Sequence, residues 1–265
     1  RGASLAWGVA VAALVLALAS WLLPRSPGGG GAARARLTVP GPPGAQLQND
    51  AASFAISPDG STLVFAASDS SGTPKLWLRP LDGLIARQLP GTDRASLPFW
   101  SPDGRSLGFF ADTKLKTIRI ESARIEALCD APDPRGGTWG SQGSIVFAPI
   151  AMGSLYSVPS EGGAVTLVLR PDTTRGETAL RYPEFLPDGR GFLFVALPQR
   201  GGDYQAYLGH LGTSDRRALM LAGAAPVYAQ PGWLATLKND RPVAQRFDAG
   251  QGKVTGKPVV RGDEP

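Results

Sequence analysis

The sequence Ser57-Pro58-Asp59-Gly60 occurs again as Ser101-Pro102-Asp103-Gly104 and, with one change, as Leu186-Pro187-Asp188-Gly189. Two degenerate copies, Gly140-Ser141-Gln142-Gly143 and Ala229-Gln230-Pro231-Gly232, complete the series. Neighbouring copies are separated by about 40–45 residues, a period typical of a β-propeller in which each repeat folds as one blade. The spacing predicts five blades, whose expected repeats are 53–96, 97–136, 137–181, 182–225 and 226–265.

Each copy has the composition of a tight turn. Proline sets φ at the first corner, aspartate hydrogen-bonds nearby backbone, and glycine adopts a positive φ without steric cost. These residues are therefore predicted to have structural roles. The expected turn residues are Pro58, Asp59, Gly60, Pro102, Asp103, Gly104, Gly143, Pro187, Asp188, Gly189 and Gly232.

The segments between the turns have the pattern of short strands. An apolar run such as Leu63-Val64-Phe65 follows each turn, a third segment such as Leu76-Trp77-Leu78-Arg79 alternates, and a more polar fourth segment such as Arg87-Gln88-Leu89 ends the repeat. This order predicts a four-stranded meander, with the most apolar strand inside and the most polar strand outside. The fold is predicted to be all-β, and no segment after residue 23 has the pattern of a long amphipathic helix.

The chain is interpreted as a fragment of a longer protein. It begins with Arg1 and ends at Pro265 without a terminal closing strand. Propellers close with four to eight blades. We expect the native ring to have six to eight, with the remaining blades encoded beyond the C-terminal end.

An aromatic side chain precedes four of the five turns, and three of these residues are candidates for a binding face: Trp100, Trp139 and Tyr228. Two roles are open for these residues, packing between blades and lining a binding face. Packing is the favoured interpretation, because ligand-binding residues of a rigid scaffold are found mainly on its loops.

The composition limits the classes of function. The chain has 34 glycines and 24 prolines, yet 43% of its residues are hydrophobic, which suits many turns in a folded domain rather than disorder. The net charge is +5, but the basic residues are spread among the repeats, so no nucleic-acid partner is predicted. The single cysteine, Cys129, excludes a disulfide framework within the chain.

The N-terminal segment is predicted to be a membrane anchor. Residues 3–23 contain no charge, and this length suffices to cross a hydrocarbon core of about 30 Å. The alternative is a signal peptide cleaved after Ala17-Leu18-Ala19, but the apolar run continues past that point. The expected domains are a transmembrane helix at 1–24, a flexible Gly/Pro-rich linker at 25–35 and the propeller at 36–265.

The flanking charges do not decide the orientation of this anchor. Arginines follow the apolar run at positions 25, 34 and 36, which by the positive-inside rule places the propeller in the cytoplasm. Only Arg1 is available for the count on the other side, and long domains cross membranes largely regardless of charge.

Residues 35–39 form a further strand candidate, of the kind that completes the last blade of a propeller.

No catalytic, cofactor-binding or metal-binding site is predicted. His210 is the only histidine, which disfavours a His-dependent triad or a multi-His metal centre. The segment Trp139-Gly140-Ser141-Gln142-Gly143 lacks the first glycine of a nucleophile elbow and falls where a repeat turn belongs. Asp59, Asp103 and Asp188 recur once per blade, a spacing that suits turns rather than one metal ion.

Four stretches resemble known families. Phe54-Ala55-Ile56-Ser57-Pro58-Asp59-Gly60 and Leu76-Trp77-Leu78-Arg79-Pro80-Leu81-Asp82 are similar to the TolB-like (PD40, WD40-like) propeller repeat. Pro98-Phe99-Trp100-Ser101-Pro102-Asp103-Gly104-Arg105 and Arg135-Gly136-Gly137-Thr138-Trp139 resemble the C-terminal half of membrane-anchored bacterial serine/threonine protein kinases. The resemblance covers roughly residues 36–248, and the chain itself contains no kinase motif.

The resemblance implies a sensor. In such kinases a cytoplasmic kinase domain precedes one transmembrane helix and an extracytoplasmic propeller, so the expected location is the bacterial inner membrane with a periplasmic propeller. An envelope protein or a small ligand is the expected partner, in addition to the membrane contacted by residues 3–23. ATP and magnesium are expected only with a kinase domain upstream of residue 1. The alternatives are a TolB-like envelope interaction scaffold and the non-catalytic propeller of a serine peptidase or transmembrane regulator.

Overall fold

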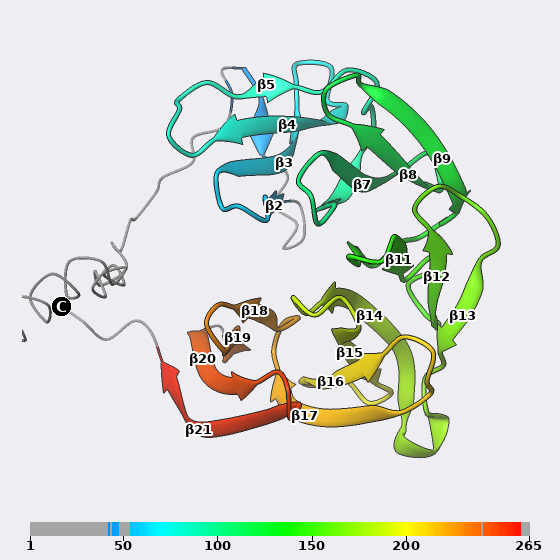
Figure 1. The fold of residues 1–265 in the computed structure, drawn as a ribbon, viewed down its shortest axis with the longest axis vertical. Helices are drawn as coiled ribbons and strands as arrows, with labels where there is room; N and C mark the ends of the chain where they lie inside the picture. Colours follow the sequence, from blue (N-terminus) through cyan, green and yellow to red (C-terminus); the bar gives the residue numbers. More distant parts are fainter. Residues whose placement is uncertain (1–41, 43, 48–53, 240, 261–265) are drawn as a thin grey trace, which may run out of the picture. The chain divides into compact units, whose positions relative to one another are not determined.

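The computed structural model describes residues 42, 44–47, 54–239 and 241–260. These residues form an all-β, five-bladed propeller of antiparallel sheets, and Figure 1 shows the sheets following one another in sequence order. The fold class predicted from the turn period is thus confirmed for this part of the chain. The expected anchor at 1–24, the linker at 25–35 and the strand candidate at 35–39 lie outside the described residues. Among the residues that are described, no helix is long and apolar enough to span a membrane.

Each blade is a meander in which strands adjacent in sequence pair with one another. Blade 1 contains β2 (Phe54–Ile56), β3 (Thr62–Ser68), β4 (Pro74–Pro80) and β5 (Arg87–Gln88), and β1 (Gln46–Leu47) pairs with β3 as a fifth strand. Blade 2 contains β6 (Ser96–Trp100), β7 (Ser106–Ala111), β8 (Lys114–Arg119) and β9 (Arg124–Asp130). Blade 3 contains β10 (Gly137–Trp139), β11 (Ser144–Phe147), β12 (Leu155–Pro159) and β13 (Thr166–Leu169).

The last two blades have longer strands. Blade 4 contains β14 (Glu177–Phe185), β15 (Gly191–Pro198), β16 (Tyr204–His210) and β17 (Arg216–Ala222), and blade 5 contains β18 (Val227–Ala229), β19 (Trp233–Lys238), β20 (Arg241–Asp248) and β21 (Lys253–Val260). β14 begins before the repeat start expected near residue 182, because a register shift between Arg181 and Glu184 lets the strand pair with β15 further toward its N-terminal end. A short 3-10 helix, η1 (Thr173–Arg175), precedes it.

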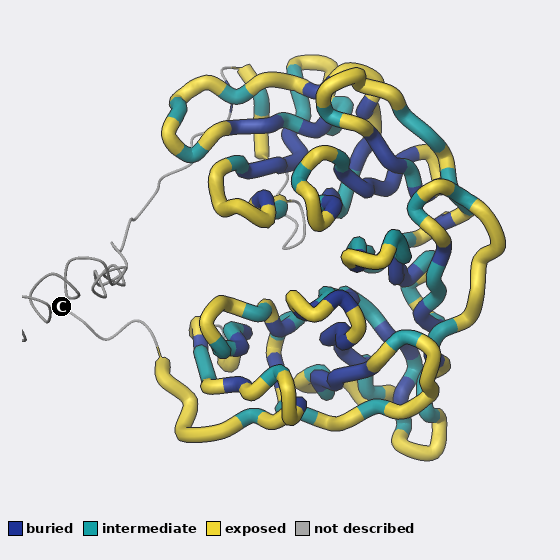
Figure 2. The backbone as a smooth tube through the Cα atoms, viewed as in Figure 1, coloured by how far each residue is buried: buried dark blue, intermediate teal, exposed yellow. Residues whose placement is uncertain are grey.

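Burial follows the order of the strands in each sheet. The second strand is the most deeply buried: from Leu63 to Ala67 in β3 and from Gly191 to Ala196 in β15, every residue is buried. The outer strands alternate or are exposed, as in β9 and β21. Figure 2 shows the same gradient, with dark blue along the second and third strands and yellow along β21. Burial of the apolar runs therefore accounts for the order of strands that the sequence predicts.

The hydrophobic core lies between neighbouring blades. Leu76 of blade 1 packs with Phe109 of blade 2, and Phe110 of blade 2 packs with Phe147 of blade 3. Val146 of blade 3 packs with Phe194 of blade 4, and a further cluster joins blade 4 to blade 5. Each sheet therefore buries its faces against the next sheet, so the loops at the strand ends remain available for binding.

Candidate binding face

The repeated turns join the first and second strands of the blades. In four of them the glycine N–H donates to the carbonyl oxygen three residues earlier, at 2.8 Å in the Ser57–Gly60 pair and 2.9 Å in the Ser101–Gly104 pair. The turn glycines have φ values between 64° and 76°, in the left-handed region that favours glycine. Glycine at the last turn position is what lets each strand reverse direction within so few residues. These are Gly60, Gly104, Gly143, Gly189 and Gly232.

The turn aspartates hold the backbone of their own turns. Oδ1 of Asp59 accepts a hydrogen bond from the backbone N–H of Ser61, and Oδ1 of Asp103 accepts one from Arg105, each at 3.0 Å. Asp188 accepts two, from the backbone N–H groups of Arg190 and Gly191. The three carboxylates lie in separate turns, and among the described residues no cluster of three or more potential ligands that could hold a metal ion is found.

Serine hydroxyls stabilise the ionised form of two of these carboxylates. The Ser57 hydroxyl and the Ser61 backbone N–H, both donating to Asp59, lower its pKa to about 2. The Ser101 hydroxyl, followed by the Arg105 N–H, lowers the pKa of Asp103. Donors that stabilise the ionised form always shift a carboxyl pKa in this direction. Both groups are therefore negatively charged acceptors at neutral pH.

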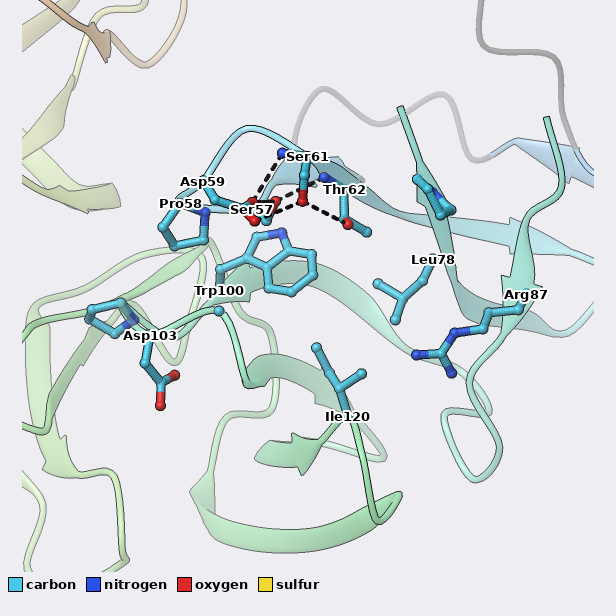
Figure 3. A pocket seen from close by; sticks show the side chains of 13 residues that line it. Ser57, Pro58, Asp59, Ser61, Thr62, Leu78, Arg87, Trp100, Asp103 and Ile120 are labelled. Carbon is cyan, nitrogen blue, oxygen red and sulfur yellow. Dashed lines mark hydrogen bonds between the residues drawn. The ribbon is translucent and has the colours of Figure 1, made fainter. Parts of the chain in front are cut away.

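A groove with a volume of about 350 Å³ lies between blades 1 and 2 beside these turns. We call it groove 1. Figure 3 shows the Trp100 indole in the middle of its lining, with Asp103 on one side and Leu78, Ile120 and Arg87 on the other. A groove of this size, lined by apolar and polar side chains together, is large enough to hold a ligand. Its lining residues are Ser57, Pro58, Asp59, Ser61, Thr62, Leu78, Pro80, Arg87, Trp100, Pro102, Asp103, Gly104 and Ile120.

Trp100 has both of the roles that the sequence leaves open. Its Nε1–H donates to the carbonyl oxygen of Ala55 at 3.1 Å, and its ring packs against the cluster between blades 1 and 2. The side chain is nevertheless only half-buried, and it lines groove 1. The hydrogen bond fixes the position of the indole, so the exposed part is presented to the groove as a rigid apolar surface.

A second groove, groove 2, with a volume of about 400 Å³, lies one blade further along. Pro102 and Asp103 line both grooves, so the turn of blade 2 forms the boundary between them. Trp139 takes in groove 2 the place that Trp100 takes in groove 1, and it also packs against the cluster between blades 2 and 3. Groove 2 is more strongly charged, because Arg119, Arg124, Glu126 and Glu161 contribute to its lining.

Tyr228 differs from the two tryptophans. It packs in the cluster between blades 4 and 5, where its ring meets that of Phe247 edge-on with centroids 6.2 Å apart. Neither groove is lined by it. Of the three aromatic residues singled out in the sequence, Trp100 and Trp139 line the two grooves, and Tyr228 has a packing position.

The remaining reactive side chains do not form a catalytic constellation within the described residues. His210 is exposed at the end of β16. Burial raises the pKa of the Cys129 thiol to about 11, so it is protonated at neutral pH and is a poor nucleophile. Both carboxylate oxygens of Glu177 are engaged: Oε1 accepts from the Tyr207 hydroxyl, and Oε2 lies 2.8 Å from Nη1 of Arg216.

Several residues of the face were not identified from the sequence as binding residues. In the sequence analysis Arg87 and Arg119 are only parts of expected strands. The loop residues Leu84 and Ile85 follow an expected turn at Asp82-Gly83. The one available signal was the apolar pair Leu84-Ile85 placed directly after a turn, where polar residues are usual. Glu184, which lies in the first strand of blade 4 and lines neither groove, was likewise not singled out from the sequence.

Comparison with known proteins adds distant likenesses. No family model matches the chain. It is 27% identical over 151 residues to the uncharacterized peptidase YuxL of Bacillus subtilis (strain 168), a match covering 53% of this chain and 21% of that relative. Among solved structures, a putative TolB from Agrobacterium tumefaciens has a TM-score of 0.57 and 19% identity, with 66% of each chain covered. TolB from Acinetobacter baumannii has a TM-score of 0.58 and 15% identity over 73% of this chain and 50% of that one.

The fold is that of a TolB-like β-propeller. At these identities the structural likenesses speak for the fold alone. The match to YuxL, at 27% identity, identifies a peptidase as a distant relative. The chain spans about a fifth of the length of that curated relative and less than two thirds of the TolB structures.

Proposed function

We propose that this propeller is the non-catalytic interaction module of a larger protein and that it binds a partner through the face formed by the repeated turns. The observation that carries the proposal is the pair of adjacent grooves, each lined by a half-buried tryptophan and a turn aspartate. Binding through loops on a rigid scaffold is common, because the loops are free to vary while the sheets keep their packing.

The absence of a reactive constellation in the described residues supports a binding role rather than catalysis. The carboxylates of the turns are engaged by their own backbone, and the sole thiol is protonated at neutral pH. A catalytic site needs a nucleophile and a base within hydrogen-bond reach. An interaction scaffold of the TolB-like kind needs only a shaped and chemically distinct surface.

A second candidate is the propeller of a serine peptidase. The identity to YuxL favours it, because that relative is named a peptidase and this chain covers only part of it. In this case the face would select or admit peptide substrates for a catalytic domain encoded elsewhere in the protein. Both candidates require the propeller to contact polypeptide.

The membrane-anchored sensor kinase remains a prediction from the sequence. It depends on the resemblance of residues 36–248 to kinase-linked propellers and on an anchor at residues 3–23, which lie outside the described part of the chain. The names of the relatives reported above contain no kinase. The inner-membrane location and the periplasmic orientation are likewise predictions from the sequence. Protease access to the propeller in intact spheroplasts tests both.

The interaction role is tested by random-peptide display against the full chain of residues 1–265. We expect enrichment of a consensus sequence, together with no hydrolysis of peptide nitroanilides by the same preparation. Selection that converges on no consensus would contradict the binding role. Hydrolysis by the purified chain would contradict the assignment as a non-catalytic module.

A further inference from the structure

Groove 1 has one cationic group whose charge is not balanced by a neighbour. Arg87 is exposed in β5, shares a face of the sheet with its cross-strand partner Leu78, and lines the groove. Among the described residues, none forms a hydrogen bond or ion pair with its side chain. Figure 3 shows the guanidinium pointing toward Leu78 and Ile120. An arginine in this position favours a carboxylate that approaches over an apolar surface.

The loop that leads into Arg87 exposes two large aliphatic side chains. Leu84 is 86% exposed and Ile85 is 83% exposed, the highest fractions among the large hydrophobic residues of the described chain. The ends of this loop, Pro80 and Arg87, both line groove 1. Exposed aliphatic residues that adjoin a groove indicate a protein-interaction surface.

The opposite rim of groove 1 offers acceptors. Asp59 and Asp103 are ionised, and their Oδ1 atoms are occupied by turn donors. For Asp103, the hydrogen bonds from Ser101 and Arg105 both reach Oδ1, so Oδ2 remains able to accept from a ligand. A carboxylate rim excludes acidic groups from that side and attracts N–H donors.

Groove 2 lies next to groove 1 across the turn that carries Pro102 and Asp103, and we call the two neighbouring grooves together the track. A ligand that occupies both grooves must cross the blade 2 turn between them, which an extended chain can do and a compact metabolite cannot. Arg119 of groove 2 is exposed, and it too has no ion pair among the described residues, whereas Arg124 pairs with Glu126 at 2.8 Å. The track therefore presents cations at two points along its length.

From these observations we infer that the track binds an extended peptide segment of a partner protein, with an aliphatic side chain against Trp100 and Ile120 and an acidic side chain paired with Arg87. The backbone N–H groups of the peptide face Asp103, and Leu84 and Ile85 pack on the flanking residues of the partner. This inference rests on the proposed interaction function and specifies the ligand class and the site.

The test measures fluorescence anisotropy of labelled peptides with the full chain of residues 1–265 in detergent. The acidic probe contains Asp-Leu-Ile-Glu between Gly-Ser linkers, the basic probe contains Lys-Leu-Ile-Lys, and a polar probe contains Asp-Ser-Ser-Glu. We expect the acidic probe to bind best. Arg87→Glu should weaken its affinity at least about tenfold and should improve binding of the basic probe.

Matched variants separate the site from general charge and fold effects. Arg200→Glu changes an arginine that is also exposed, in the loop between β15 and β16, and it should leave the affinity for the acidic probe unchanged. Leu84→Ser with Ile85→Ser should weaken binding, whereas Leu221→Ser, at a 59% exposed residue of β17, should not. Circular dichroism of each variant verifies that the sheets remain folded.

Three outcomes would overturn the inference. One is equal loss of affinity in Arg87→Glu and Arg200→Glu. Another is no saturable binding of the acidic probe up to about 1 mM. The third is that the paired loop variants reduce co-sedimentation with anionic lipid vesicles and leave peptide affinity unchanged, which would assign the loop to a lipid surface. If the peptides selected by display share a consensus and bind Arg87→Glu as well as the wild type, the site inferred here is wrong, but the proposed interaction function is still supported.

Discussion

Glu184 in the first strand of blade 4 accepts a hydrogen bond at its Oε1 from the backbone N–H of Tyr228 in blade 5, at 3.2 Å. One blade earlier, Oγ1 of Thr138 accepts from the backbone N–H of Phe185 at 3.0 Å. Thr138 and Glu184 occupy equivalent places, since each lies one residue before the aromatic residue that precedes a turn. A polar side chain at this place thus links one blade to the next.

This link makes stability depend on pH through Glu184. Burial raises the pKa of its carboxyl from 4.5 to about 7, and the Tyr228 N–H offsets only part of the effect. With the folded pKa above the unfolded one, the folded state holds the proton more tightly. The contribution of Glu184 to stability is therefore greatest below pH 4.5, falls as the pH rises from 4.5 to about 7, and stays reduced above that.

We expect Glu184→Gln to stabilise the protein at pH 8 by about 1–3 kcal/mol and to have little effect at pH 4.5, because glutamine accepts the same hydrogen bond without charge. Thermal unfolding at the two pH values measures the difference. Glu161→Gln, at an exposed turn position, serves as the control and should show no such pattern. An equal change in melting temperature at both pH values would contradict the role assigned to Glu184.

Thr138→Val should destabilise the protein by about 1–3 kcal/mol, because it keeps the shape of the side chain and leaves the Phe185 N–H without an acceptor. Thr138 is buried, so water does not readily replace the lost partner. Thr138→Ser keeps the hydroxyl and should recover most of the loss. Chemical denaturation of both variants decides the matter, and equal midpoints would show that the hydrogen bond does not matter.

The sequence predicts the fold well because its signal is repeated. The turn period and the apolar runs follow from backbone geometry and burial, and each of them recurs in the chain, so a degenerate copy such as Gly140-Ser141-Gln142-Gly143 is still recognised by position. The binding face is less predictable. Arg87 and Ile120 line the same groove only because blades 1 and 2 pack together, and no spacing in the sequence records that arrangement.

A close approach within blade 2 is also hidden from the sequence: Gly108 of β7 lies beneath the ring of its cross-strand partner, Phe99 of β6. A Cβ atom at Gly108 would lie 2.1 Å from Cζ of Phe99, so the ring or the strand would have to move. We expect Gly108→Ala to cost about 1–3 kcal/mol. Combining it with Phe99→Leu should cost less than the sum of the two single changes, as a double-mutant cycle measures. Strict additivity would mean that the ring does not limit this site.

Gly104 in the turn of blade 2 allows the effect of backbone conformation to be tested without a steric clash. Gly104 has φ +68, and a Cβ atom there would have Pro58 Cδ, at 3.8 Å, as its nearest neighbour. Gly104→Val should therefore cost more than about 1 kcal/mol through φ alone, since a β-branched residue tolerates the left-handed region poorly. Gly104→Asn should cost less, because asparagine adopts this region more readily.

Two further variants make the result specific to the turn. Gly83→Val adds the same side chain at a glycine without positive φ, where the nearest atom would be Pro80 Cβ at 3.5 Å, and it should be tolerated better than Gly104→Val. Asp103→Ala removes the hydrogen bonds to Ser101 and Arg105 from an exposed carboxylate, and it should cost less than Gly104→Val. If all these variants unfolded at the wild-type temperature, the repeated turns would not be what holds the first two strands of each blade together.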